Sequence, residues 1–184
     1  MLDVEYARDL IFIGVLFGVA AFVWAGWGQE RPPAGVRWRV LLGAVQLAGL
    51  GLVAIGVPPL IRFWGANTAL TPDNPALLGY IIVFWVEVVV IVVLEIWLIR
   101  TKRAQAVAPM VLIVVGVHFF PLGFVFGQGI LFVAGALVTA AGVAALVWRR
   151  RDVAPSFWCG ILAGPVFVLI GALAAATGRA AVGA

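Results

Sequence analysis

The sequence predicts an all-α protein that crosses a membrane six times, and two observations carry that prediction. Of 184 residues, 65% are hydrophobic and only 11% are charged, whereas soluble domains carry about 25% charged residues. The apolar residues fall into six segments, each close to the roughly 20 residues that a helix needs to span a bilayer. No polar stretch is long enough for a soluble domain, so we expect residues 1–184 to form a single six-helix transmembrane domain.

Each apolar segment is bounded by charged or turn-forming residues. We expect the first to be retained as a helix, because acidic residues precede it and Trp24 and Trp27 close it without the small-residue cleavage site of a signal peptide. Pro58 and Pro59 are expected to end or bend the second. The glycines of Gly127-Gln128-Gly129 permit a tight reversal. The segments are residues 8–28, 39–61, 77–99, 107–126, 129–148 and 157–177.

Basic residues alternate between the two predicted ends of the bundle and so predict its orientation. Nine lie in the loops after the first, third and fifth segments, against three at the opposite end, which are Arg8, Arg62 and Arg179. Loops rich in Lys and Arg stay in the cytoplasm. We therefore expect both termini outside a bacterial cytoplasmic membrane. The three hairpins also resemble one another, as in Ala20–Trp24 and Ala144–Trp148, and a triplicated hairpin is one interpretation.

Several functions are excluded by what the sequence lacks. The net charge is +4, and we attribute it to arginines that anchor the loops at the membrane surface. Because there is also no soluble domain, we expect the lipid bilayer to be the partner and not nucleic acid. A single His cannot supply two haem ligands, and the single cysteine, Cys159, lies in an apolar segment, as expected of a buried thiol. Ser156 has no evident His partner for hydrolysis. We expect no cofactor, no metal and no catalytic motif.

Only three ionisable side chains lie deep in the predicted spans: Glu87 and Glu95 on the third and His118 on the fourth. Charges inside a membrane are costly and usually functional. At 100° per residue the two carboxylates share one stripe of the third helix with Tyr80, which predicts a buried seam. They lie about 12 Å apart along the axis, too far to ligate one metal ion. Glu95, nearer the loop, serves either as a relay or as a partner of Arg100.

Counting residues from the ends of antiparallel helices places Glu87 and His118 at nearly the same depth, so we predict a contact between them. One interpretation is a proton-binding or cation-binding site in a polar path through the bundle. The other is a hydrogen bond that locks two helices together. Gln46, on the second helix, either extends this polar seam or joins helices.

A proline follows the histidine by three residues. Pro121 removes the helical hydrogen bond to Val117, and we expect the freed carbonyl to lie near the imidazole as a ligand for a proton, water or a cation. The run His118-Phe119-Phe120-Pro121-Leu122, together with the helix count, resembles small uncharacterised bacterial six-helix membrane proteins that carry an H-F-x-P-L run on a central helix. That resemblance covers about five residues and implies no activity.

Three functions remain open at this point. The first is a small channel or transporter for protons or a small polar solute that uses Glu87, His118 and Glu95. The second is a non-catalytic scaffold or accessory subunit of a larger membrane partner, in which the Glu–His contact is structural. The third is a lipid-modifying enzyme.

Six thin helices enclose little interior, so we also expect a homo-oligomer. Gly14-x-x-x-Gly18, Gly123-x-x-x-Gly127 and Gly160-x-x-x-Gly164 favour close helix packing without naming a partner.

Overall fold

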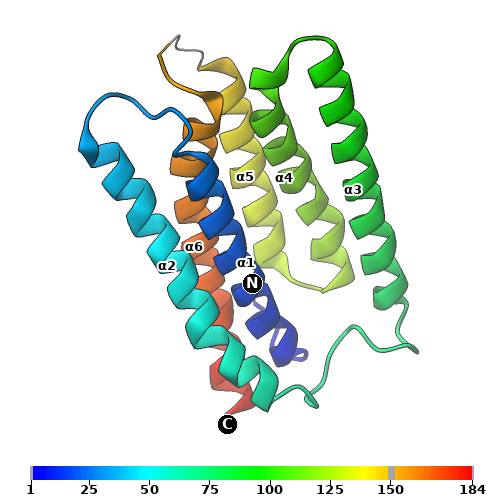
Figure 1. Cartoon of the computed structure of the whole chain (residues 1–184). Helices are drawn as coiled ribbons and strands as arrows, with labels where there is room; N and C mark the ends of the chain where they lie inside the picture. The colour runs from blue at the N-terminus through cyan, green and yellow to red at the C-terminus, as the bar shows by residue number, and fades with distance from the viewer. Residues whose placement is uncertain (1, 149–151, 184) are drawn as a thin grey trace.

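The computed structural model describes residues 2–148 and 152–183, and this part of the chain is all-helical (Figure 1). Six helices are long and apolar enough to cross a membrane, which confirms an all-α, multi-pass membrane protein. A short 3-10 helix, η1, precedes the fourth. The elements are α1 (Ala7–Trp27), α2 (Val36–Arg62), α3 (Pro75–Arg100), η1 (Ala104–Ala106), α4 (Val107–Val125), α5 (Gly129–Val147) and α6 (Pro155–Val182).

The prolines explain some helix boundaries but not others. α3 and α6 begin at Pro75 and Pro155, where the missing N–H costs nothing, and Asn74 Oδ1 caps α3 by accepting from Ala76 N at 2.9 Å. Of the two effects expected of Pro58 and Pro59, the structure excludes that they end the second helix, because α2 continues through both to Arg62. They fall in its last two turns, and beyond them Phe63 N still donates to the Pro59 carbonyl at 2.9 Å.

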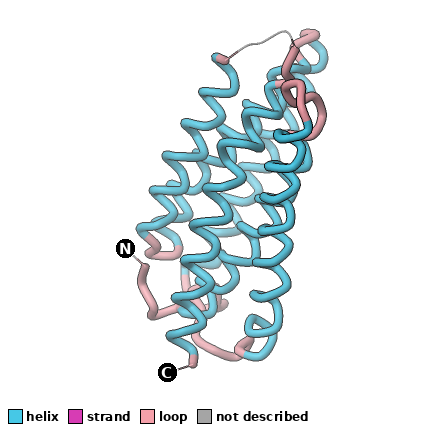
Figure 2. Tube along the Cα trace, turned by 90° about the vertical axis from the view of Figure 1, so that its left-hand side faces the viewer, coloured by secondary structure: helices cyan, strands magenta, loops and turns pink. Residues whose placement is uncertain are grey.

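The helices run side by side along the long axis of the bundle (Figures 1 and 2). α1 packs against both α2 and α6, α4 packs against α5, and α5 joins the two groups by packing on α6. The C-terminal ends of α1, α3 and α5 lie at one end of the bundle, and the start of α1 and the end of α6 lie at the other. Arg149–Arg151 lie outside the described residues.

Glycines set the closest of these contacts. A Cβ on Gly14 would lie 2.6 Å from Ala175 Cβ of α6, and one on Gly160 would lie 2.6 Å from the Trp24 carbonyl of α1. Gly18 meets α2 in the same way, 2.8 Å from the Gly49 carbonyl. Bare backbones thus let α1 approach both neighbours, as small residues do in membrane bundles.

The core lies where α1, α4 and α6 meet. Phe17 packs against Phe119 and Phe167, with ring centroids 5.2 and 5.3 Å away. Cys159 is fully buried in the same core, as expected of an apolar thiol. This packed interior fixes α4, and with it one side of the candidate site.

α3 lies at the edge of the bundle and packs mainly on α4 (Figure 1). Leu98 is its one buried residue, and Phe84 is 43% exposed. The stripe that holds Tyr80, Glu87 and Glu95 does face the bundle, but these side chains are only partly buried. A fully buried seam was therefore too strong a prediction, because a single neighbouring helix cannot cover the stripe.

Candidate functional site

The structure brings Glu87 and His118 together near the middle of α3 and α4. Glu87 Oε1 lies 3.0 Å from His118 Nδ1, and the side chains are 13% and 16% exposed. The two helices are antiparallel neighbours joined by a short loop, so residues at equal depth face each other. This contact spans the single seam that holds α3 to the bundle.

The imidazole also contacts its own helix. His118 Nδ1 lies 2.6 Å from the carbonyl oxygen of Val115. A carbonyl oxygen can only accept a hydrogen bond, so Nδ1 carries a hydrogen and Glu87 Oε1 is a second acceptor beside it. Both polar contacts of the ring therefore use the same nitrogen, Nδ1.

The imidazole contacts a different carbonyl from the one that Pro121 was expected to free. The carbonyl that contacts the imidazole belongs to Val115, not to Val117. Helical side chains lean back over the preceding turn, so the ring of residue 118 reaches a carbonyl three positions earlier. Pro121 itself is exposed and lines an apolar cavity on the outer side of α4.

Two cavities meet at the pair. The first, which we name the aromatic crevice, has a volume of about 270 Å³ between α1, α3 and α4, and it is bordered by Phe12, Phe17, Tyr80, Phe84, Phe119 and Phe126 together with the pair. The second, the outer cavity, holds about 450 Å³ among apolar side chains of α3 and α4 such as Val86 and Val117. Glu87 and His118 are the residues that line both. The pair is thus the wall between two cavities.

Of the other sequence candidates, Tyr80 and Pro121 each line a cavity that the pair borders, and Glu95 and Gln46 lie apart from it. Tyr80 lines the aromatic crevice, where its ring stacks on Phe84 with centroids 6.3 Å apart. Glu95 lines neither cavity and forms no hydrogen bond or ion pair with the described residues, Arg100 included. Gln46 faces α1, because its Nε2 would lie 3.0 Å from a Cβ on Gly26. The candidate site therefore consists of Glu87 and His118, with Tyr80 on the aromatic crevice and Pro121 on the outer cavity.

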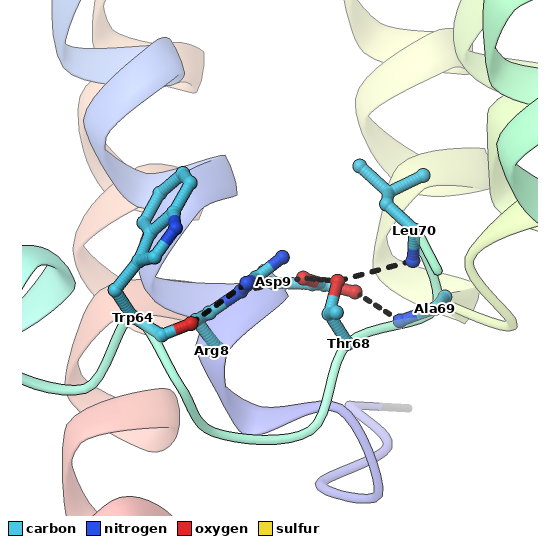
Figure 3. Close-up of polar contacts among 6 residues, drawn as sticks. All are labelled: Arg8, Asp9, Trp64, Thr68, Ala69 and Leu70. Atoms are coloured by element: carbon cyan, nitrogen blue, oxygen red, sulfur yellow. Dashed lines mark hydrogen bonds and ion pairs between the residues drawn. The ribbon is translucent and has the colours of Figure 1, made fainter. Parts of the chain in front are cut away.

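Sequence reasoning missed a buried carboxylate at the end of the bundle where α1 begins. Asp9 is 1% exposed, and it accepts hydrogen bonds from Thr68 Oγ1 at 2.7 Å and from Ala69 N at 2.8 Å (Figure 3). Arg8 beside it donates to the Trp64 carbonyl at 2.9 Å. We name these residues the Asp9 clamp. It fastens the loop between α2 and α3 to the first turn of α1, three residues before Phe12 of the aromatic crevice.

A second missed contact fixes the N-terminal segment. Gln128 is 1% exposed, and its amide exchanges two hydrogen bonds with the backbone of Asp3, at 3.0 and 2.8 Å. The turn that holds it was predicted from its glycines, and Gly127 indeed has a φ of 62°. At the opposite end of the bundle, Ser156 Oγ donates to Glu30 Oε2 at 2.7 Å. These contacts are structural, since each fastens a terminal or loop segment to the start of a helix.

No protein-family model, curated protein or solved structure matches this chain. The geometry of the site therefore carries the functional argument. Its elements are one carboxylate, one imidazole and two cavities at mid-helix depth.

Proposed function

We propose that this multi-pass membrane protein is a small proton-linked transporter of a bacterial cytoplasmic membrane, with Glu87 as its proton-binding group and His118 as the partner of that group. The observation that carries the proposal is the position of the pair as the shared wall of the aromatic crevice and the outer cavity. The lining of the outer cavity is wholly apolar, so the Glu87 carboxylate faces the aromatic crevice and would have to turn, with a small movement of α3, to exchange with the outer cavity.

The peripheral position of α3 supports such a movement. It packs mainly on α4, and most of its length is exposed. A carboxylate at this depth is costly unless it carries a proton or meets a positive charge. Binding and release of a proton at Glu87 therefore change the charge at the seam between α3 and α4. Glu95 lies outside both cavities, and the proposal does not depend on it.

The first test asks whether water reaches Glu87. We would replace the buried Cys159 by Ala, introduce Glu87→Cys and apply a membrane-impermeant thiol reagent to each side of reconstituted vesicles. The proposal expects labelling at position 87. The matched control is Leu112→Cys, a fully buried position on α4, which should stay unlabelled. If neither position 87 nor position 112 is labelled in the folded protein, the proposal is wrong.

A second candidate, a scaffold or accessory subunit, is favoured by the exposure of α3. Its large apolar side chains include Trp85 at 59% and Val93 at 59% exposure, a surface that either lipid or a partner helix would cover. In that case the Glu–His contact serves only to hold α3 on α4. Glu87→Gln distinguishes the two functions, because it should abolish flux in a transporter that still folds, whereas in a scaffold it should lower thermal stability and the recovery of the partner.

A further inference from the structure

The aromatic crevice holds polar atoms that the chain leaves unpaired. Glu87 uses Oε1 and His118 uses Nδ1 in their contact. The remaining oxygen, Oε2, and the remaining nitrogen, Nε2, form no hydrogen bond with the residues that the structure describes. Neither atom is fully buried, so a molecule in the adjoining crevice can contact both of them. A ligand that enters the crevice therefore gains most by offering a complementary group to these atoms.

The charge of that ligand follows from the groups that face Glu87. α4 contributes His118, whose Nδ1 hydrogen already serves the Val115 carbonyl, so the ring needs no second proton. α3 contributes Tyr80, and the α1 residues on the crevice, Phe12 to Ala20, include no ionisable side chain. No Lys or Arg lies among the described residues that line it. An ionised Glu87 therefore meets no Lys or Arg in the crevice and has only the imidazole beside it, and a ligand cation would complete the site.

The walls of the crevice match an organic cation better than a metal ion. Six aromatic side chains border it, two from α1, two from α3, and Phe119 and Phe126 from α4 and its end. The faces of aromatic rings carry negative potential and attract cations that lack a tight hydration shell, with about 2 kcal/mol or more when water is excluded. The volume of about 270 Å³ lies just below the roughly 300 Å³ where drug-sized pockets begin. The ligand is accordingly a small one.

We propose that the aromatic crevice binds a small aromatic or aliphatic monocation of the quaternary-ammonium type, with Glu87 as counter-ion and the surrounding rings as its cage. This deepens the proposed function and rests on it, since it names the substrate class of the same site. The cation and the proton compete for one carboxylate. Each cation that binds to protonated Glu87 releases one proton, and charge is conserved in the exchange.

The test uses phenyltrimethylammonium and its uncharged isostere, tert-butylbenzene, with purified protein in lipid nanodiscs. We expect saturable binding of radiolabelled phenyltrimethylammonium, weaker as the pH falls, with one proton released per cation in weakly buffered solution. An excess of tert-butylbenzene should displace it poorly, because the shape is kept and the charge is lost. Proton release is measured on the unmodified protein, so the test does not depend on any variant that fails to fold.

Matched variants locate the binding. Glu87→Gln should weaken binding at least about tenfold by removing the counter-ion, and Glu95→Gln should leave it unchanged because Glu95 is outside the crevice. Phe84→Leu should weaken binding, whereas Phe124→Leu, on an 80% exposed side chain of α4 away from the crevice, should not.

Three results would overturn the inference: no binding, equal binding of the neutral isostere, or binding that Glu87→Gln leaves intact. Failure here is distinct from failure of the proposed function. If a thiol reagent reaches position 87 and no organic cation binds, Glu87 still serves protons, and only the substrate class is wrong. If the cation binds with proton release and the reagent does not reach position 87, the cation site stands and the proposed transport function is wrong.

Discussion

Asp9 Oδ2 accepts a hydrogen bond from Ala69 N at 2.8 Å, across 60 positions of sequence, and Oδ1 accepts from Thr68 Oγ1 (Figure 3). Thr68 and Ala69 of the loop between α2 and α3 therefore both donate to the same carboxylate. The loop has to pass from the end of α2 to the start of α3 at the edge of the bundle. The Asp9 clamp therefore fixes where α3 begins, and α3 carries Glu87.

The first prediction concerns this clamp. Asp9→Ala should lower the free energy of unfolding by about 2–3 kcal/mol, because two charge-assisted hydrogen bonds are lost and the Ala69 N–H is left unpaired. SDS titration in mixed micelles would measure it. Asp152→Ala, at an exposed position, is the control and should change little. Equal stability of both variants would show that the clamp contributes nothing.

Why the sequence did not reveal the clamp follows from where its partners lie. Glu87 and His118 were paired by counting along two antiparallel neighbouring helices, which needs only the rise per residue. Asp9 instead meets a loop 59 and 60 positions away, and Gln128 meets Asp3 at a separation of 125. No periodic pattern specifies the path of a loop, so no counting could have joined these residues.

The position of α3 was hidden for another reason. It is the most apolar of the six helices and the least buried. In water those two properties would conflict, but lipid is as apolar as a protein core, so hydropathy predicts the span and says nothing of which face meets lipid. The number of helices and most of their ends could be predicted, but the position of α3 at the edge of the bundle, mainly against α4, could not.

The second prediction separates stability from function at the pair. Glu87→Gln should lower the free energy of unfolding by less than about 1 kcal/mol, because the amide oxygen can still accept from His118 Nδ1–H. Glu87→Leu removes that acceptor and should cost more. Thermal unfolding of both variants in one detergent measures the difference.

The control for this pair of variants is Glu95→Gln, which has no described partner to lose. If Glu87→Gln proves as unstable as Glu87→Leu, the carboxylate itself holds α3 on α4. The scaffold function would then lead over proton-linked transport.

The third prediction concerns helix approach. Gly14→Ala should destabilise the protein by about 1–3 kcal/mol, because the new methyl group would lie 2.6 Å from Ala175 Cβ and 2.8 Å from the Gly171 carbonyl. Gly43→Ala is the same chemical change in α2, with nothing within 4 Å. It should be neutral or should stabilise the helix by up to about 1 kcal/mol. Measured by SDS titration, similar effects at both sites would contradict the close packing of α1 on α6.

The fourth prediction concerns orientation. The described basic residues of the α1–α2 and α3–α4 loops gather at one end of the bundle, and positive loops remain in the cytoplasm. In a Cys159→Ala background, Asn67→Cys should react with an impermeant thiol reagent on intact bacterial cells, because the loop after α2 lies at the opposite end. Lys102→Cys should react only after the cells are opened. Both positions are exposed, so access is set by the membrane and not by packing. The reverse labelling pattern would show that the bundle has the opposite orientation, with the Asp9 clamp inside the cell.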